Sequence, residues 1–202
     1  PPPTPRHSSA ASDVYKRQAS IPKERIQVYF IDNEEYFKRK STFLDKEGKL
    51  FEDNDERAIF FAKGVLETIK RLNWSPDIIH VHGWMSALLP IYLKEIFKNE
   101  PIFQKSKIVT SLYSNEFEKN LNKDMINKVL FDEIDQKSVS DLKDPTYENL
   151  MRIAIDYSDG IIIGSENVSS KTIGYLKSYK NPILDFQPKD SFSESYIESV
   201  SY

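Results

Sequence analysis

The stretch PDIIHVHGW, residues 76–84, decides the fold of this chain. Its centre, Ile78–His82, is apolar and β-branched, which predicts a buried strand, and Gly83 predicts a turn directly after it. An apolar helix is expected from about Ser86 to Phe97. Pro90 has no backbone N–H, so this helix must either start late or kink. The stretch therefore predicts a strand that delivers two histidines and a tryptophan onto the turn before a helix.

Similar units follow along the chain. Further strands are expected at 26–31, 107–112, 161–163 and 182–184, and further helices at 53–72, 147–157 and 168–178, with the charged segment 115–143 forming short helices and loops. Short apolar strands that alternate with helices predict right-handed crossovers and a mostly parallel sheet covered on both faces. The predicted fold class is α/β, as a Rossmann-like three-layer domain.

Composition narrows the functional classes. The chain has 202 residues, 39% hydrophobic and 29% charged, with a formal net charge of -3 and no cysteine. A net negative charge does not favour binding to nucleic acid. No apolar run approaches the roughly 18 residues of a membrane span. The absence of cysteine excludes disulfides, thiolate catalysis and Cys-type zinc sites. We expect a cytoplasmic protein that binds neither nucleic acid nor membrane.

Three segments are expected. Residues 1–20 are rich in proline, serine and charge and lack apolar periodicity, so they predict a non-native or disordered leader. Residues 21–186 carry all the predicted elements and form one domain. Residues 187–202 are a polar tail.

The two histidines lie two residues apart on one strand, so their side chains share a face. They could form part of a metal site, but no third ligand is evident at comparable spacing. We interpret His80 as a hydrogen-bonded core residue. His82 lies at the carboxyl end of the strand, which faces the ligand crevice in open α/β sheets, and it could donate to a sugar hydroxyl or stabilise developing charge.

Other candidates lie near the same rim. Trp84 could cover the face of a sugar or pack against the helix. Asn115, in Tyr113-Ser114-Asn115-Glu116, follows the next strand and could line the same crevice. Ser165 precedes a predicted helix, where it could cap the helix or help to hold an anion. No dinucleotide fingerprint, P-loop or nucleophile–base pair can be assembled.

The motifs as a set resemble those of bacterial glycogen synthases and plant starch synthases. Residues 76–84 with Ala87-Leu88, Pro90 and Tyr92-Leu93-Lys94 are similar to the family's P-D-[IV]-[IV]-H-x-H-D-W…A-L-x-P-x-x-L-K pattern. Upstream matches are 29–33, 36–37, 53–57 and 60–61, and downstream matches are 156–160 and 164–166. The chain resembles most a short, single-domain branch of the family that is associated with Bacteroidetes-like bacteria.

The resemblance implies the N-terminal half of a GT-B fold. It implies transfer of glucose from ADP-glucose (or UDP-glucose) to the non-reducing end of an α-1,4-glucan, without a metal or other cofactor. The family histidine that contacts the transferred glucose corresponds to His82, which makes His82 the catalytic candidate. His82, Trp84 and Asn115 are the substrate-binding candidates.

Departures from the family pattern qualify this expectation. Gly83 stands where the family has aspartate, and the family's second histidine is absent from Thr110–Asn115. Neither the K-x-G-G-L nucleotide loop nor the C-terminal domain is represented. We therefore expect the isolated chain to be inactive, with a protein partner as one source of a second domain. The alternative is a non-catalytic homologue that binds glucan or a partner.

Overall fold

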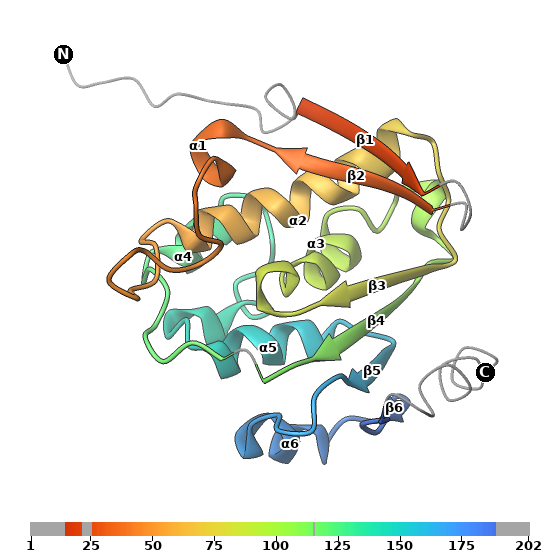
Figure 1. Ribbon diagram of the computed structural model, residues 1–202. Helices are drawn as coiled ribbons and strands as arrows, with labels where there is room; N and C mark the ends of the chain where they lie inside the picture. Colours follow the sequence, from red (N-terminus) through yellow and green to blue (C-terminus); the bar gives the residue numbers. More distant parts are fainter. Residues whose placement is uncertain (1–14, 22–25, 115, 189–202) are drawn as a thin grey trace.

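The computed structural model describes residues 15–21, 26–114 and 116–188 (Figure 1). Its strands are β1 (Tyr15–Ile21), β2 (Ile26–Asp32), β3 (Ile78–His82), β4 (Lys107–Leu112), β5 (Gly160–Ile163) and β6 (Ile183–Leu184). Its α-helices are α1 (Glu34–Phe37), α2 (Asn54–Arg71), α3 (Leu89–Glu95), α4 (Met125–Leu130), α5 (Tyr147–Asp156) and α6 (Ser170–Leu176). Short 3₁₀ helices occur at η1 (Trp84–Ser86), η2 (Pro101–Phe103) and η3 (Ser140–Lys143).

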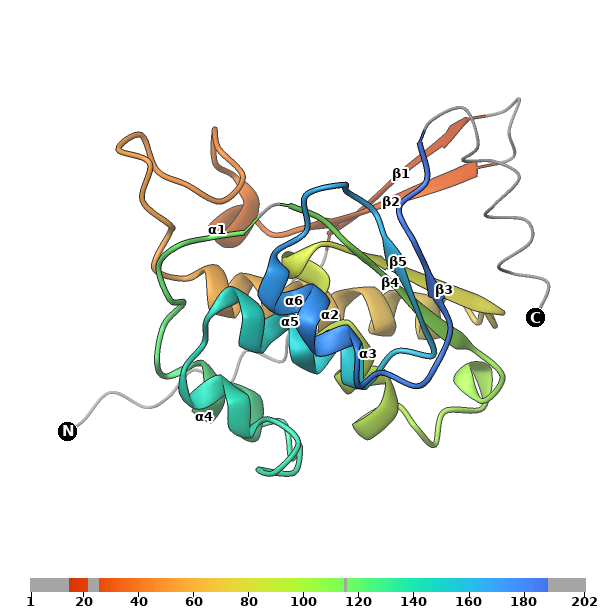
Figure 2. The ribbon, with the colours of Figure 1, turned by 90° about the horizontal axis from the view of Figure 1, so that it is seen from below.

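The central sheet is parallel and has the strand order β3-β4-β5-β6. Along the chain, each new strand is added on the same side of the preceding one. Because crossovers between parallel strands are right-handed, the connecting helices α3, α5 and α6 then lie on one face. Neighbouring pairs among α2, α3, α5 and α6 contact one another, and Figure 2 shows these helices gathered together. The predicted α/β, Rossmann-like fold is confirmed.

Along strand β3, the face of the sheet that lies away from the helices is exposed. Ile79 and Val81 are buried under the helices, whereas Ile78, His80 and His82 alternate with them and are exposed. The expectation that the sheet is covered on both faces is therefore wrong along β3. An alternating burial pattern arises where helices cover one face of a strand.

A separate antiparallel ribbon, β1–β2, pairs Tyr15 with Asp32 at one end and Ile21 with Ile26 at the other. It lies over α2 (Figure 1), where an added Cβ on Gly64 would be 3.0 Å from the Ile31 side chain. Residues 15–20 were expected to belong to a leader, and the structure places them in β1 instead. Pairing in an antiparallel ladder uses backbone groups, so it does not require the apolar periodicity that this segment lacks. Residues 1–14 of the expected leader, and 189–202 of the expected tail, lie outside the described residues.

Helix α2 confirms the predicted amphipathic helix and carries a large share of the core. Ala58, Ala62 and Leu66 are fully buried on one side of it. Asp53 stands at the N-cap position, but its side chain does not cap the helix. The Asp53 carboxylate accepts hydrogen bonds from the Arg39 guanidinium instead, one of them 2.8 Å long. Arg39 lowers the pKa of Asp53 against the opposing effect of burial.

The segment after β3 shows how the chain accommodates Pro90. The turn η1 comes first, and α3 then starts at Leu89 with Pro90 in its first turn, where a missing N–H costs nothing. The helix therefore starts late rather than kinking. No helix in the described ranges is long and apolar enough to cross a membrane.

The charged segment 116–143 forms α4, η3 and loops, as predicted, but it is more than a solvated surface. Asp132 pairs with Lys63 of α2 at 2.5 Å and accepts from the Tyr92 hydroxyl at 2.6 Å. Lys128 of α4 bonds the buried Asp55 carboxylate at 2.7 Å. These links fasten the segment to the helical layer.

Candidate functional site

Strands β3, β4 and β5 end close together, and His82 lies where they meet. His82 is paired in register with Ser111 of β4, and its Nδ1 is 2.7 Å from the hydroxyl oxygen of Tyr113, which follows β4. The two rings are stacked, with centroids 6.0 Å apart. The Tyr113 ring lies against Gly164 after β5, where an added Cβ would be 2.5 Å from its Cε1. The close approach requires glycine there. This is the rim of the sheet at which open α/β folds bind ligands.

His80 lies behind His82 on the same face of β3. Its Nε2 is 2.8 Å from Ser111 Oγ, and the two imidazole centroids are 4.0 Å apart. The prediction of a hydrogen-bonded His80 is confirmed, but the prediction that it lies in the core is wrong because its face of β3 is exposed. Desolvation, and then repulsion from His82, lower the pKa of His80 to about 4. Desolvation also lowers the pKa of His82.

Both imidazoles are consequently neutral near pH 7, and the rim works through hydrogen bonding rather than positive charge. The Tyr113 contact occupies Nδ1 of His82, so Nε2 is the ring nitrogen whose role depends on this bond. If Tyr113 donates to Nδ1, Nε2–H is a donor; if Nδ1–H donates to Tyr113, Nε2 is an acceptor. Within the described residues, no group of three or more His, Cys, Asp or Glu side chains is arranged to hold a metal ion.

Gly83 adopts φ 69° and ψ 177°, a backbone region that is essentially restricted to glycine. The turn is closed by Ser86, whose hydroxyl contacts the carbonyl oxygens of His82 at 2.7 Å and Gly83 at 3.1 Å. The glycine that replaces the expected aspartate is therefore required by the turn as this chain forms it. Ser86 was not singled out by the sequence, since its role depends on the direction of the turn.

Trp84 is 2% exposed. Its ring packs between Phe43, at a centroid distance of 4.8 Å, and Phe117, at 5.1 Å. Phe117 in turn packs on Tyr147, whose hydroxyl donates to the Tyr113 carbonyl at 2.9 Å. This geometry favours the packing alternative for Trp84, which supports the segment that carries Tyr113 instead of presenting a face to a ligand.

The two remaining candidates have different outcomes. Asn115 lies outside the described residues. Ser165 does not cap a helix: α6 begins at Ser170, and Ser169 is its N-cap, accepting from the Thr172 N–H at 3.2 Å. Both suggestions for Ser165, a cap or an anion site at a helix N-terminus, are wrong, because Gly164–Asn167 precede the helix by several residues.

A parallel sheet whose connecting helices pack together defines the class of Rossmann-like α/β domains. The family model of the starch synthase catalytic domain matches residues 5–173, so the chain belongs to that family. The match begins within the segment that was expected to be a leader.

Relatives and a solved structure agree with this assignment. The chain is 41% identical over 102 residues to a glycogen synthase of Chlorobium limicola, covering 50% of this chain and 21% of the relative. It is 31% identical over 151 residues to a glycogen synthase of Chlorobaculum parvum, covering 72% of this chain and 30% of the relative. The chain thus spans about a fifth to a third of the length of these relatives.

The fold is similar to that of the catalytic domain of starch synthase IV from Arabidopsis thaliana, a structure bound to ADP and acarbose. The TM-score is 0.61 at 16% identity, over 88% of this chain and 38% of that one. This supports the expected N-terminal half of a GT-B fold. By its sequence, the chain belongs to the family of glycogen and starch synthases.

Proposed function

We propose that this chain takes part in glucosyl transfer from ADP-glucose to the non-reducing end of an α-1,4-glucan, with His82 contacting the transferred glucose. The observation that carries the proposal is the position of His82: a neutral imidazole at the carboxyl rim of a parallel sheet, held by Tyr113 at 2.7 Å, in a chain of this family. Its Nε2 can exchange a hydrogen bond with a sugar hydroxyl without the cost of desolvating a cation.

The isolated chain is proposed to be inactive. Departure of a nucleoside diphosphate requires positively charged groups directed at the leaving oxygens. Among the described residues, the rings that contact His82 are those of His80 and Tyr113, and neither supplies a positive charge near neutral pH. No cationic side chain is among these ring contacts, so the proposal is that the cationic groups come from elsewhere, and a partner protein that carries a second domain is one source.

The test is an assay of glucose incorporation into glycogen from ADP-glucose labelled in the sugar. The isolated chain should give no transfer. Transfer that disappears in His82→Ala but persists in Phe131→Ala, at an exposed residue directly after α4, would contradict the inactivity while supporting the role of His82. Transfer that survives His82→Ala would contradict that role.

The second candidate function is a non-catalytic module that binds glucan or a partner protein. The neutral contacts of His82 favour it, because they suit binding of a sugar better than stabilisation of a departing diphosphate. Affinity electrophoresis in gels containing glycogen separates the two functions. Retardation of the chain without any transfer, even when extract from the source cell is added, supports the binding module.

A further inference from the structure

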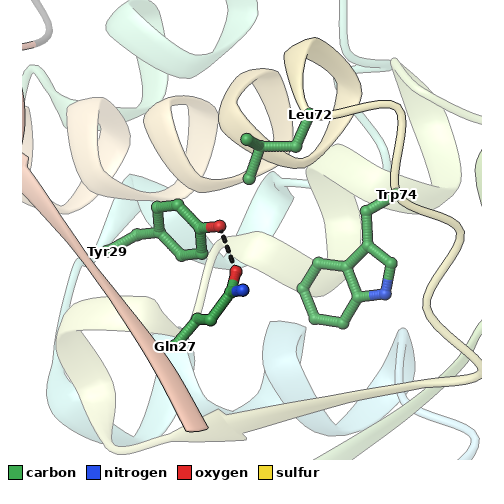
Figure 3. Close-up of a pocket in the computed structure, with 4 residues that line it drawn as sticks. All are labelled: Gln27, Tyr29, Leu72 and Trp74. Atoms are coloured by element: carbon green, nitrogen blue, oxygen red, sulfur yellow. Dashed lines mark hydrogen bonds between the residues drawn. The ribbon is translucent and has the colours of Figure 1, made fainter. Parts of the chain in front are cut away.

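A hollow of about 460 Å³ lies away from the His82 rim, lined by Gln27, Tyr29, Leu72 and Trp74 (Figure 3). This volume is within the range of roughly 300–1,000 Å³ that is typical of small-molecule sites. Trp74 precedes β3, whereas His82 ends it, and a five-residue strand spans about 13 Å between its first and last residues. The hollow and the rim are thus at opposite ends of β3.

The backbone positions Trp74 firmly. Helix α2 ends in a Schellman motif: Asn73 has φ 50°, its N–H donates to the Lys70 carbonyl at 3.0 Å, and the Trp74 N–H donates to the Ile69 carbonyl at 3.3 Å. The residue in the place of Trp74 usually folds back onto the helix in this motif. Here the Trp74 side chain is 54% exposed instead.

Strand β2 provides the opposite wall. Gln27 and Tyr29 are two residues apart and project from the same face of the strand. The Tyr29 hydroxyl donates to Gln27 Oε1 at 2.5 Å. That bond occupies the carbonyl end of the amide and leaves its NH₂ group on the side of Trp74 (Figure 3). A donor is thereby oriented toward the space between two aromatic rings.

The chemistry of the four side chains selects a kind of ligand. Two aromatic faces and a leucine provide apolar contact, an amide and a phenol provide hydrogen bonds, and none of the four is charged at pH 7. Such a lining offers nothing to balance a phosphate or a carboxylate. It suits a neutral molecule with an apolar face and a hydroxyl-bearing edge, which is the character of a pyranose ring.

We propose that this hollow is a second carbohydrate site, which holds part of a glucan chain while the His82 rim is free to act. The choice of an α-1,4-glucan as the ligand rests on the proposed function. The neutral, aromatic character of the site is independent of it.

The two tryptophans of the chain make the test direct. Trp74 is 54% exposed and Trp84 is 2% exposed, so iodide quenching of fluorescence reports mainly on Trp74. Maltoheptaose should protect the unaltered chain from iodide in a saturable way. In Trp74→Phe, iodide quenching should be weak with or without the sugar.

Affinity is then measured by calorimetry with maltoheptaose. Trp74→Ala should weaken binding roughly tenfold, as expected for the loss of one aromatic stacking partner. Phe131→Ala, at a residue 78% exposed on another surface, is the matched control and should bind like the unaltered chain. His82→Ala should also retain this binding.

Each outcome decides something. Protection of Trp74 that survives His82→Ala supports the second site even if no transfer is ever detected. Binding abolished by His82→Ala but unaffected by Trp74→Ala contradicts the second site and leaves the rim proposal standing. If maltoheptaose fails to protect Trp74, or sedimentation shows a dimer that Trp74→Ala dissociates, the carbohydrate assignment is overturned.

Discussion

The two tryptophans lie beyond opposite ends of strand β3, and one is buried whereas the other is exposed. Trp84, at the carboxyl end, is buried between Phe43 and Phe117, and polar rings on the strand face the solvent beside it. Trp74, at the amino end, is exposed beside a hollow, and the polar groups there hydrogen-bond each other. One end of the strand thus presents hydrogen-bonding groups on an aromatic support, and the other presents the aromatic surface itself. Under the two proposals, the His82 rim would contact the hydroxyls of a sugar and the Trp74 hollow its apolar face.

The largest expected effect concerns the stability of these two sites. Trp84→Ala should lower the free energy of unfolding by about 3–5 kcal/mol, because it removes a buried aromatic ring and leaves a cavity. Trp74→Ala should change it by less than about 0.5 kcal/mol, as for an ordinary surface substitution. Urea denaturation followed by circular dichroism measures both. Equal losses in the two variants would contradict the comparison.

Restoring the family's acid beside His82 should have the next largest effect. Gly83→Asp forces a side chain into φ 69° and ψ 177°, at an expected cost of about 1–3 kcal/mol. The matched control is Gly174→Ala, within helix α6 and with open space at its Cβ, which should stabilise by about 0.5–1 kcal/mol. Thermal and urea unfolding give the two values. A neutral Gly83→Asp would mean that the turn can adopt another backbone conformation.

Each of the two sites contains a tyrosine hydroxyl hydrogen-bonded to a polar side chain. Tyr113→Phe removes the hydrogen bond to His82 Nδ1 and should cost about 0.5–1.5 kcal/mol. Tyr29→Phe removes the exposed bond to Gln27 and should cost less. If Tyr113 only packs, its loss will not change the ¹⁵N shifts of the His82 ring. If Tyr113 orients the imidazole, those shifts will report a different tautomer.

The smallest expected effect is a pH dependence due to His80. Its pKa is near 6.5 in the unfolded chain and about 4 in the folded one, so the unfolded state binds more protons between these values. Stability should therefore fall as pH decreases from 6.5 to 4, by at most about 1 kcal/mol once solvent screening of this exposed face is considered. His80→Gln should flatten that part of the stability profile. An unchanged profile would contradict the lowered pKa.

Much of the fold could be predicted because local patterns were strong. The apolar runs at 78–82 and 107–112 became β3 and β4 with those bounds, and the apolar spacing behind Asn54 became α2. The exposure of His80 could not be predicted in this way, because it depends on strand order. Only the order β3-β4-β5-β6 shows that the helices cover a single face.

The site was predictable in position but not in detail. The strand-end rule placed His82 and Tyr113 on one rim, where they contact each other. The burial of Trp84 depends on the η1 turn, which directs the ring toward Phe43 and away from the rim. Residues 15–20 contain no apolar pattern, and their strand follows from pairing with β2, which a reading of local periodicity does not detect.

If His82 faces the sugar of the donor, its ring nitrogens will respond to ADP-glucose in a ¹⁵N NMR titration. Imidazole and indole signals are followed together during addition of ADP-glucose, with His80→Gln, His82→Ala and Trp74→Phe providing the assignments. Saturable shifts of the His82 nitrogens, with the Trp74 indole unchanged, are the predicted result. His82 signals that do not move at saturating ADP-glucose would contradict the account.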